Sequence, residues 1–444
     1  MNGMSAWRML LLVDRPALAA VAFALVQLLW TRASFAQNPT PTGSGDSAPA
    51  AASTQAGASE SGRRGLLPEP QWLTKTMQRI AVRTDAPPSQ KDGFYPAIGS
   101  TMAGAGWLTA GPGYRHHIVG PWLAYASAGL SWHGYLTAEV ATSANLGKSV
   151  SVGAQALWQD QTQLIYYGPH ASTSLSDRSE YRLRASDYTV SAAFRMPGDW
   201  SLQVAGGLMP QPQLLGPSGW HDRGFPDTRG RFDDALAPGL GAQPSLWHAN
   251  LGVAINRLDE PGHPTDGWLA HAEAAAYRDR DFGRFLFNRY QLDFVQAVPL
   301  TTNTWTLLIR ESAVLTATPY GDQVPFYLEP ALGGQNLLRG YLDYRFHDRN
   351  IVAAQIESRW ALLTHVDGAL FVDLGALAPN ARAFSSAELK TSYGGGIRLH
   401  TAKNTLMRID LARSSEGWRW LVQFRDPFRL SLFRRRAAVI PLVP

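Results

Sequence analysis

The chain has 444 residues, a formal net charge of +5 and no cysteine. Disulfides, thiolate metal sites and cysteine nucleophiles are therefore excluded, and an exported protein of this composition must be held together by its core or by closure of a sheet. The excess of arginine lies in residues 1–36 and 425–444, so the body of the chain is close to neutral and offers no basic face for nucleic acid.

Residues 1–36 have the pattern of a secretory signal peptide. Two arginines accompany an apolar run over residues 16–30, and the small residues Ser34 and Ala36 occupy the positions that a signal peptidase reads. The run is shorter than the about 20 residues that a membrane-spanning helix needs. We expect cleavage after this segment, with a retained N-terminal anchor as the alternative.

A linker and a short lead-in are expected next. Residues 37–65 are mostly Pro, Thr, Ser, Gly and Ala, which bury too little apolar surface to order themselves, so we predict a disordered linker. Residues 66–92 are predicted to be a short periplasmic lead-in or plug segment. The spacing of Trp72, Leu73, Met77 and Ile80 suits one amphipathic helix, and an irregular segment is the alternative.

From residue 93 to residue 428 the sequence alternates with a period of two, which places alternate residues on opposite faces of a sheet. In one segment Leu370, Val372 and Leu374 oppose Phe371, Asp373 and Gly375. The composition, with 11% aromatic and 17% charged residues, also fits a secreted β-sandwich or propeller. However, Arg, Asp and Gln recur on one face of strand after strand. Lipid outside and a wet lumen explain both faces, so we predict an all-β, transmembrane antiparallel β-barrel.

The length of this region predicts about 16 strands, at roughly 20 residues for each strand and its connection. Counts of 14 and 18 remain open. Trp418 and Trp420 share the apolar face at one strand end, where an interfacial aromatic belt is expected. Residues 429–444 form a basic C-terminal tail that is either periplasmic or folded back into the pore.

The segment Leu332 to Tyr341 concentrates glycine, arginine and aromatic residues between two alternating runs. The phase of the next two strands points Glu357 and Asp373 into the lumen, and the planar guanidinium of Arg339 can bind two carboxylates at once. Gly340 would allow close approach to the wall, and Tyr341 would wedge the tip. We predict a loop that folds into the lumen and is held there by Arg339.

The residues Leu338-Arg339-Gly340-Tyr341 resemble the [VIL]-R-G-[FY] loop of the outer-membrane insertase superfamily, which includes BamA, TamA, the two-partner secretion transporters and bacterial surface antigens. The glycine pair Gly333-Gly334 precedes this motif, and Phe371 to Gly375 resembles the F-x-D-x-G strand of the same family. Residues 394–398 and 408–412 resemble its last strands. The resemblance covers residues 93–428 and implies contacts of Arg339 with Glu357 and Asp373.

This resemblance implies a barrel in the outer membrane of a Gram-negative-type bacterium that assists insertion or translocation of polypeptide or lipid without enzymatic chemistry. The partners implied are outer-membrane lipid and client outer-membrane or secreted polypeptides. Residues 37–92 are too few for a well-cored POTRA domain beside the linker, so a short member without POTRA domains is expected. The alternatives are a passive pore or structural surface barrel that has lost the insertase role, and an anchor for a periplasmic partner.

Catalysis, a cofactor and a metal site are not expected. Ser131, His133 and His170 form no recognisable triad with a partner that would orient a base. The consecutive residues His116 and His117 should face opposite sides of a strand, which disfavours a shared metal ion.

Overall fold

The computed structural model describes residues 65–85, 91–99, 109–219, 224–301, 304–334 and 337–430. The chain separates into residues 1–61 and 62–444, and the fold below is that of the second unit. The predicted signal peptide, nearly all of the predicted linker and the tail beyond Leu430 lie outside the described residues.

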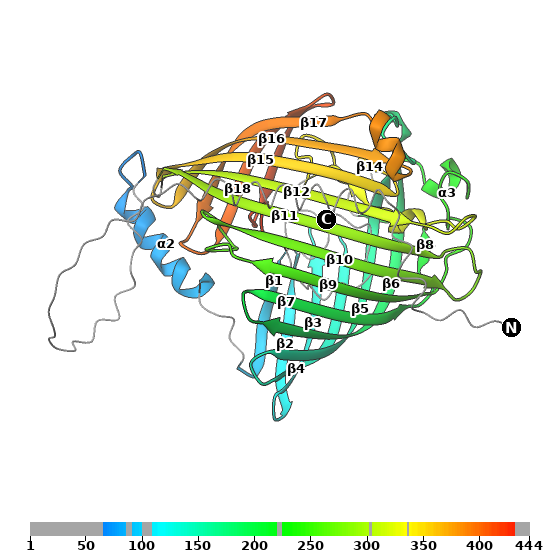
Figure 1. Cartoon of the computed structure of the whole chain (residues 1–444), viewed down its shortest axis with the longest axis horizontal. Helices are drawn as coiled ribbons and strands as arrows, with labels where there is room; N and C mark the ends of the chain where they lie inside the picture. Colours follow the sequence, from blue (N-terminus) through cyan, green and yellow to red (C-terminus); the bar gives the residue numbers. More distant parts are fainter. Residues whose placement is uncertain are drawn as a thin grey trace. The chain divides into compact units, whose positions relative to one another are not determined.

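The described part of the chain forms sixteen long strands in one antiparallel meander, as the sequence predicts (Figure 1). In chain order these are β1 (Gly93–Gly99), β2 (Thr109–Val119), β3 (Trp122–Ser131), β4 (Leu136–Leu146), β5 (Val150–Tyr166), β6 (Ser179–Met196), β7 (Trp200–Met209), β9 (Leu246–Asn256), β10 (Gly267–Asp279), β11 (Phe287–Thr301), β12 (Trp305–Ala317), β15 (Asn350–Leu363), β16 (Val366–Ala378), β17 (Lys390–His400), β18 (Thr405–Ser414) and β19 (Gly417–Gln423). Each of these strands pairs with the next one along the chain, and the short β8 (Gln213–Leu215) pairs with β6.

The remaining elements are short and lie between or before the strands. They are α2 (Gln71–Thr84), α3 (Thr228–Arg231), the 3₁₀ helices η2 (Leu175–Asp177), η3 (Phe326–Leu328) and η4 (Ala381–Ser386), and the strand pair β13 (Ala331–Leu332) and β14 (Phe346–His347). Among the described residues, no helix has both the length and the apolar character needed to cross a membrane.

The two faces of the meander differ as the period-two pattern predicts. On β16 the side chains of Leu370 and Val372 are exposed, whereas Phe371 and Asp373 are buried. Charged side chains occupy the buried face of the last strands: Glu357, Arg359, Asp373, Arg398, Arg408 and Asp410 are each at most 2% exposed. A water-soluble sandwich would bury the apolar set instead. The chain is therefore a transmembrane antiparallel β-barrel with an apolar outer surface and a polar lumen.

Short turns join the strands at one end of the barrel, for example β15 to β16 and β17 to β18, and long connections lie at the other. In outer-membrane barrels the short turns are periplasmic. The lead-in packs at this end, where the backbone N–H of Leu66 donates to Ala361 (2.9 Å) and Glu69 binds the ring of His365 (2.8 Å). The helix α2 expected from the sequence follows it.

Replacing Leu370 with arginine should lower the free energy of unfolding by about 2–4 kcal/mol, because a cation near the middle of the lipid-facing surface loses its hydration. Trp418→Arg is the matched control at a strand end and should cost about 0–1 kcal/mol. Urea unfolding of protein folded into liposomes measures both values. Equal costs at the two positions would mean that this face does not contact lipid.

Candidate functional site: the loop arginine and the lumenal charges

The connection from β12 to β15, residues 318–349, is folded into the barrel and is named the LRGY loop below. Its base is held by the β13–β14 pair, in which Leu332 faces Phe346. Gly334 has a φ of +86°, and a Cβ atom there would lie 1.8 Å from Asp343 Oδ1, so the turn requires glycine. Apolar side chains of the loop, among them Leu332, Leu338 and Phe346, form one buried cluster with Val314 and Ile351 of the barrel wall.

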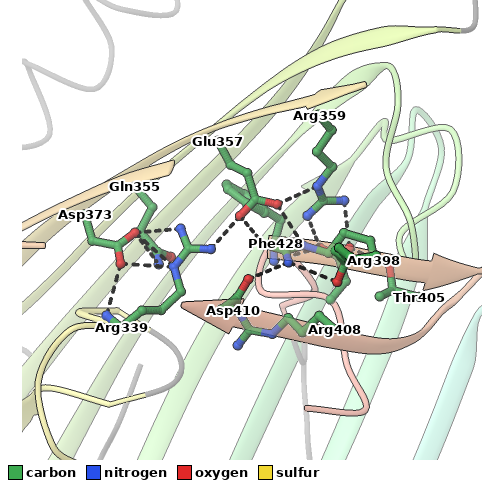
Figure 2. Close-up of polar contacts among 12 residues, drawn as sticks. Arg339, Gln355, Glu357, Arg359, Asp373, Arg398, Thr405, Arg408, Asp410 and Phe428 are labelled. Atoms are coloured by element: carbon green, nitrogen blue, oxygen red, sulfur yellow. Dashed lines mark hydrogen bonds and ion pairs between the residues drawn. The ribbon is translucent and has the colours of Figure 1, made fainter. Parts of the chain in front are cut away.

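Arg339 is fully buried and lies between the two carboxylates predicted from the strand phase (Figure 2). One Nη atom donates to Glu357 Oε2 at 2.5 Å, and the other donates to Asp373 Oδ1 at 2.7 Å. Nε and the backbone N–H of Arg339 both donate to Asp373 Oδ2 at 3.0 Å. Asp373 therefore accepts hydrogen bonds from both the guanidinium group and the backbone of the loop tip.

Residues next to Arg339 in the loop pack closely against the inner surface of the barrel. The ring of Phe371 lies 3.5 Å from the guanidinium carbon, a cation–π contact. A Cβ atom on Gly340 would lie 2.7 Å from Ser392 Cβ, so this position tolerates only glycine without movement of the wall. Gly375 leaves room for Leu338, whose Cδ1 would be 3.2 Å from an added Cβ.

Glu357 is shared by three arginines that come from three elements. Besides Arg339, it accepts from Arg359 Nε at 2.6 Å and from Arg398 at 2.9 Å. Arg398 also donates to Asp410 at 2.5 Å, and Arg408 donates to the other oxygen of Asp410 at 2.9 Å. These contacts join β15, β17 and β18 inside the lumen (Figure 2).

The segment after β19 completes the charge balance. Asp426 accepts two hydrogen bonds from Arg359, at 2.8 and 3.1 Å, and one from Thr405 at 2.7 Å. Phe428 is fully buried against Leu258, Leu269, Val295, Ala297 and Leu308. The chain from Asp426 to Phe428 thus folds back inside the barrel. The predicted basic tail, residues 429–444, lies outside the described residues beyond Leu430.

Four guanidinium groups and four carboxylates are therefore buried together: Arg339, Arg359, Arg398 and Arg408 with Glu357, Asp373, Asp410 and Asp426. Removing charges from water costs several kcal/mol for each ion unless partners and hydrogen bonds compensate. The equal numbers of both signs provide that compensation. The arrangement positions and stabilises the loop.

Sequence reasoning found part of this site and missed part. The alternation of β15 to β18 predicts that four further charged side chains face the lumen, namely Arg359, Arg398, Arg408 and Asp410. It does not predict the contacts that two of them, Arg359 and Arg398, make with Glu357. Asp426 lies beyond the last alternating segment, where no periodicity places a side chain.

The expectation that His116 and His117 point apart was wrong. Both rings bind the carboxylate of Asp92 through Nδ1, at 2.9 and 2.5 Å. The pairing register of β2 and β3 shifts directly after His117, and this irregularity interrupts the regular alternation of faces. Ser131 and His170 have separate partners: Ser131 Oγ accepts from the backbone of Tyr135, and His170 binds Asp348.

Comparison with known proteins places the barrel among outer-membrane proteins. Residues 136–417 match the model of the Omp85 superfamily domain. Among solved structures, BamA from Haemophilus ducreyi lacking POTRA domains 1–3 is similar with a TM-score of 0.56 at 14% identity, over 75% of this chain and 70% of that chain. This likeness concerns the fold.

CdiB from Escherichia coli is similar with a TM-score of 0.47, and CdiB from Acinetobacter baumannii with 0.41, both at 14% identity. The matches cover 76% and 73% of this chain but only 62% and 57% of the CdiB chains, which is less than two thirds of their length. A sequence search of curated proteins found no match.

Arg339→Ala should lower the free energy of unfolding by about 3–5 kcal/mol, because Asp373 would be left buried without a cation. Arg339→Lys should give an intermediate loss, since an ammonium group cannot bridge both carboxylates in the same way. A heat-modifiability gel of the membrane fraction reports the compact barrel. Tyr320→Ala, on the same loop but fully exposed, is the control and should cost less than about 0.5 kcal/mol. An unchanged compact band for Arg339→Ala would contradict the predicted role of Arg339.

Stability should fall between about pH 4.5 and pH 8 because of Glu329 in the LRGY loop. Burial, followed by repulsion from Asp348, raises the pKa of this carboxyl to about 8, while Arg349 and Arg289 oppose the shift. The folded state then keeps a proton that the unfolded state has lost, so stability is full below the unfolded pKa and declines by up to about 1.4 kcal/mol per pH unit above it. Glu329→Gln should flatten this slope in unfolding curves at pH 5, 7 and 9. A slope that is the same in wild type and variant would rule out Glu329 as its source.

Proposed function

The chain belongs to the Omp85 superfamily, and from this premise we propose that it assists insertion or translocation of polypeptides at the bacterial outer membrane, without enzymatic chemistry. The feature that supports this proposal best is the seam, defined as the outer edges of the first strand, β1, and the last strand, β19. A client strand would pair with one of these edges and leave sideways into the bilayer. Lipid is the second partner, because the seam faces the membrane.

One side of the seam is a short strand. β19 has 7 residues, whereas β5 and β6 have 17 and 18. A tilted strand needs about 9–11 residues to cross the hydrocarbon core. Among the described residues no backbone ladder pairs β1 with β19. Unpaired N–H and C=O groups at such edges accept an added strand, which is the chemistry of β-augmentation.

The LRGY loop braces the hairpin that carries one side of the seam. Arg345 binds Glu416 in the turn between β18 and β19 at 2.6 Å, and Arg419 of β19 donates to the carbonyl of Tyr341. Ser414 Oγ donates to the carbonyl of Gly340 at 2.8 Å. The loop can therefore hold β19 in place while the edge of that strand remains available to a client.

Three segments occupy the lumen, which favours a lateral route over a central pore. They are the LRGY loop, residues 426–430 and the loop between β9 and β10, residues 257–266, where His263 is 2% exposed. A passive pore would leave a wide wet passage along the axis. The lumenal packing thus supports the insertase-type function over the alternative of a passive pore.

Locking the seam should abolish the proposed activity. Because the chain has no cysteine, Ala97→Cys on β1 can be combined with a single cysteine at Trp420, Leu421 or Val422 on β19, and the pair that forms a disulfide retained. In proteoliposomes, we expect the disulfide to reduce the assembly rate of a client barrel at least tenfold and a reductant to restore it.

The matched control is Ala144→Cys with Val152→Cys, two residues that face each other on β4 and β5. This disulfide should leave the assembly rate unchanged. Assembly that is equally fast with the seam locked, or that does not exceed empty liposomes in any state, would refute the proposed function. High, ungated ion conductance in planar bilayers would instead establish the passive pore.

A further inference from the structure

We propose that His263, Asp367 and His400 form a binding site for one divalent transition-metal ion at the periplasmic mouth of the barrel. The three residues come from the loop between β9 and β10, from β16 and from the end of β17. All three are buried, and their ligand atoms lie within 4.8 Å of one another. Nε2 of His263 is 3.2 Å from one oxygen of Asp367, and Nε2 of His400 is 3.3 Å from the other.

The hydrogen bonds on the far side of each ring fix which nitrogen carries the proton. Nδ1 of His400 lies 2.9 Å from the carbonyl of Thr401, which can only accept, so Nδ1 is the protonated atom. Nδ1 of His263 lies 2.9 Å from Thr405 Oγ1, whose own hydrogen is donated to Asp426. Nδ1 of His263 must therefore also be the donor.

Both neutral rings thus direct the lone pair of Nε2 toward the same carboxylate. The two Nε2 lone pairs and the carboxylate of Asp367 repel one another. A cation bound between them would be coordinated by all three groups. Metal-bound histidines in proteins use the same device, in which the remaining ring N–H is held by a carbonyl, hydroxyl or carboxylate. A carbonyl oxygen and a hydroxyl already hold the two rings in this way.

Protonation of both rings is the competing way to satisfy Asp367, and the surroundings oppose it. The rings are stacked, with centroids 3.9 Å apart and an interplanar angle of 6°, so two imidazolium ions would face each other closely. Coordination requires the rings to open from this parallel stack while their Nδ1 contacts remain.

Two imidazoles and one carboxylate select the class of ion. This donor set suits Zn²⁺, Ni²⁺, Co²⁺ or Cu²⁺, whereas Mg²⁺ and Ca²⁺ prefer oxygen ligands alone. Three protein ligands leave a fourth position for water, as in open zinc sites.

The ion would fasten a loop across the mouth of the barrel. Residues 257–266 leave the wall between β9 and β10 and reach the turn between β17 and β18, where the backbone N–H of Thr405 donates to Gly262 at 2.9 Å. In the meander, β11, β12, β15 and β16 lie between these two places. Only His263 of the proposed ligands belongs to this loop, so binding would tie the loop to the wall at β16 and β17.

The test is zinc titration of the full chain, folded in detergent and free of any histidine tag. His116→Asn with His117→Asn is used as background, because that exposed pair on Asp92 could bind zinc independently. We expect one Zn²⁺ per chain by isothermal titration calorimetry and slower amide hydrogen exchange in residues 257–266 when zinc is bound. His400→Asn keeps a donor toward Thr401 but removes Nε2, and it should weaken binding at least about 100-fold.

His271→Asn is the matched control. His271 is also buried against a carboxylate, that of Asp293 at 3.3 Å, but this contact involves one imidazole, whereas Asp367 is approached by two. It should bind zinc like the background protein. Unchanged affinity in both His263→Asn and His400→Asn would overturn the proposal.

A measurement on the background protein covers the case in which those variants do not fold. Bound Cu²⁺ should show remote-nitrogen couplings from two imidazoles by pulsed electron paramagnetic resonance. The absence of a bound ion, or coupling to fewer than two imidazoles, would overturn the proposal as well. Neither result bears on client insertion at the seam, so the site and the proposed function fail separately.

Discussion

The burial of the Arg339 guanidinium between Glu357 and Asp373 is the interaction on which the lumen depends. Each ion taken out of water costs several kcal/mol, and this cost is offset only when all partners are in place. Asp373 shows the dependence most clearly. Its other hydrogen bonds come from the neutral groups of Gln355 and Ser392, at 3.3 and 3.1 Å. Within the described residues its ion-pair partner is Arg339 alone, so this carboxylate is compensated only while the loop is inserted.

Glu357 behaves differently because Arg359 and Arg398 also bind it. Withdrawal of the loop would leave Glu357 with two cations and Asp373 with none, so the free-energy penalty of withdrawal falls on Asp373. The loop also contacts Glu416 and Arg419 of the last hairpin. A movement of this hairpin that pulled the loop outward would leave Asp373 on β16 without a cation, and this free-energy cost opposes the movement. The loop is therefore stably inserted in the lumen.

The fold and the centre of this site could be predicted from the sequence because both follow from regular patterns. A period of two decides which residues face the lumen, and it placed Glu357 and Asp373 on one face of neighbouring strands. The partner of these acids is on a loop, where no period operates, so Arg339 was predicted from the glycine and aromatic residues around it and from the resemblance of residues 338–341 to a family motif. Asp426 and His263 also lie outside alternating segments, and no motif marks them, so their contacts needed the three-dimensional structure.

The two lumenal clusters are connected through Asp426. This carboxylate binds Arg359 of the charge network, and it accepts the hydrogen of Thr405, whose oxygen holds Nδ1 of His263. If Asp426 left the lumen with the segment after β19, the hydroxyl of Thr405 would be released to donate to His263, and the protonated nitrogen of that ring would no longer be fixed. Asp426 is the element that the two clusters share, because the segment that follows β19 also fixes the protonated nitrogen of His263 at the periplasmic mouth.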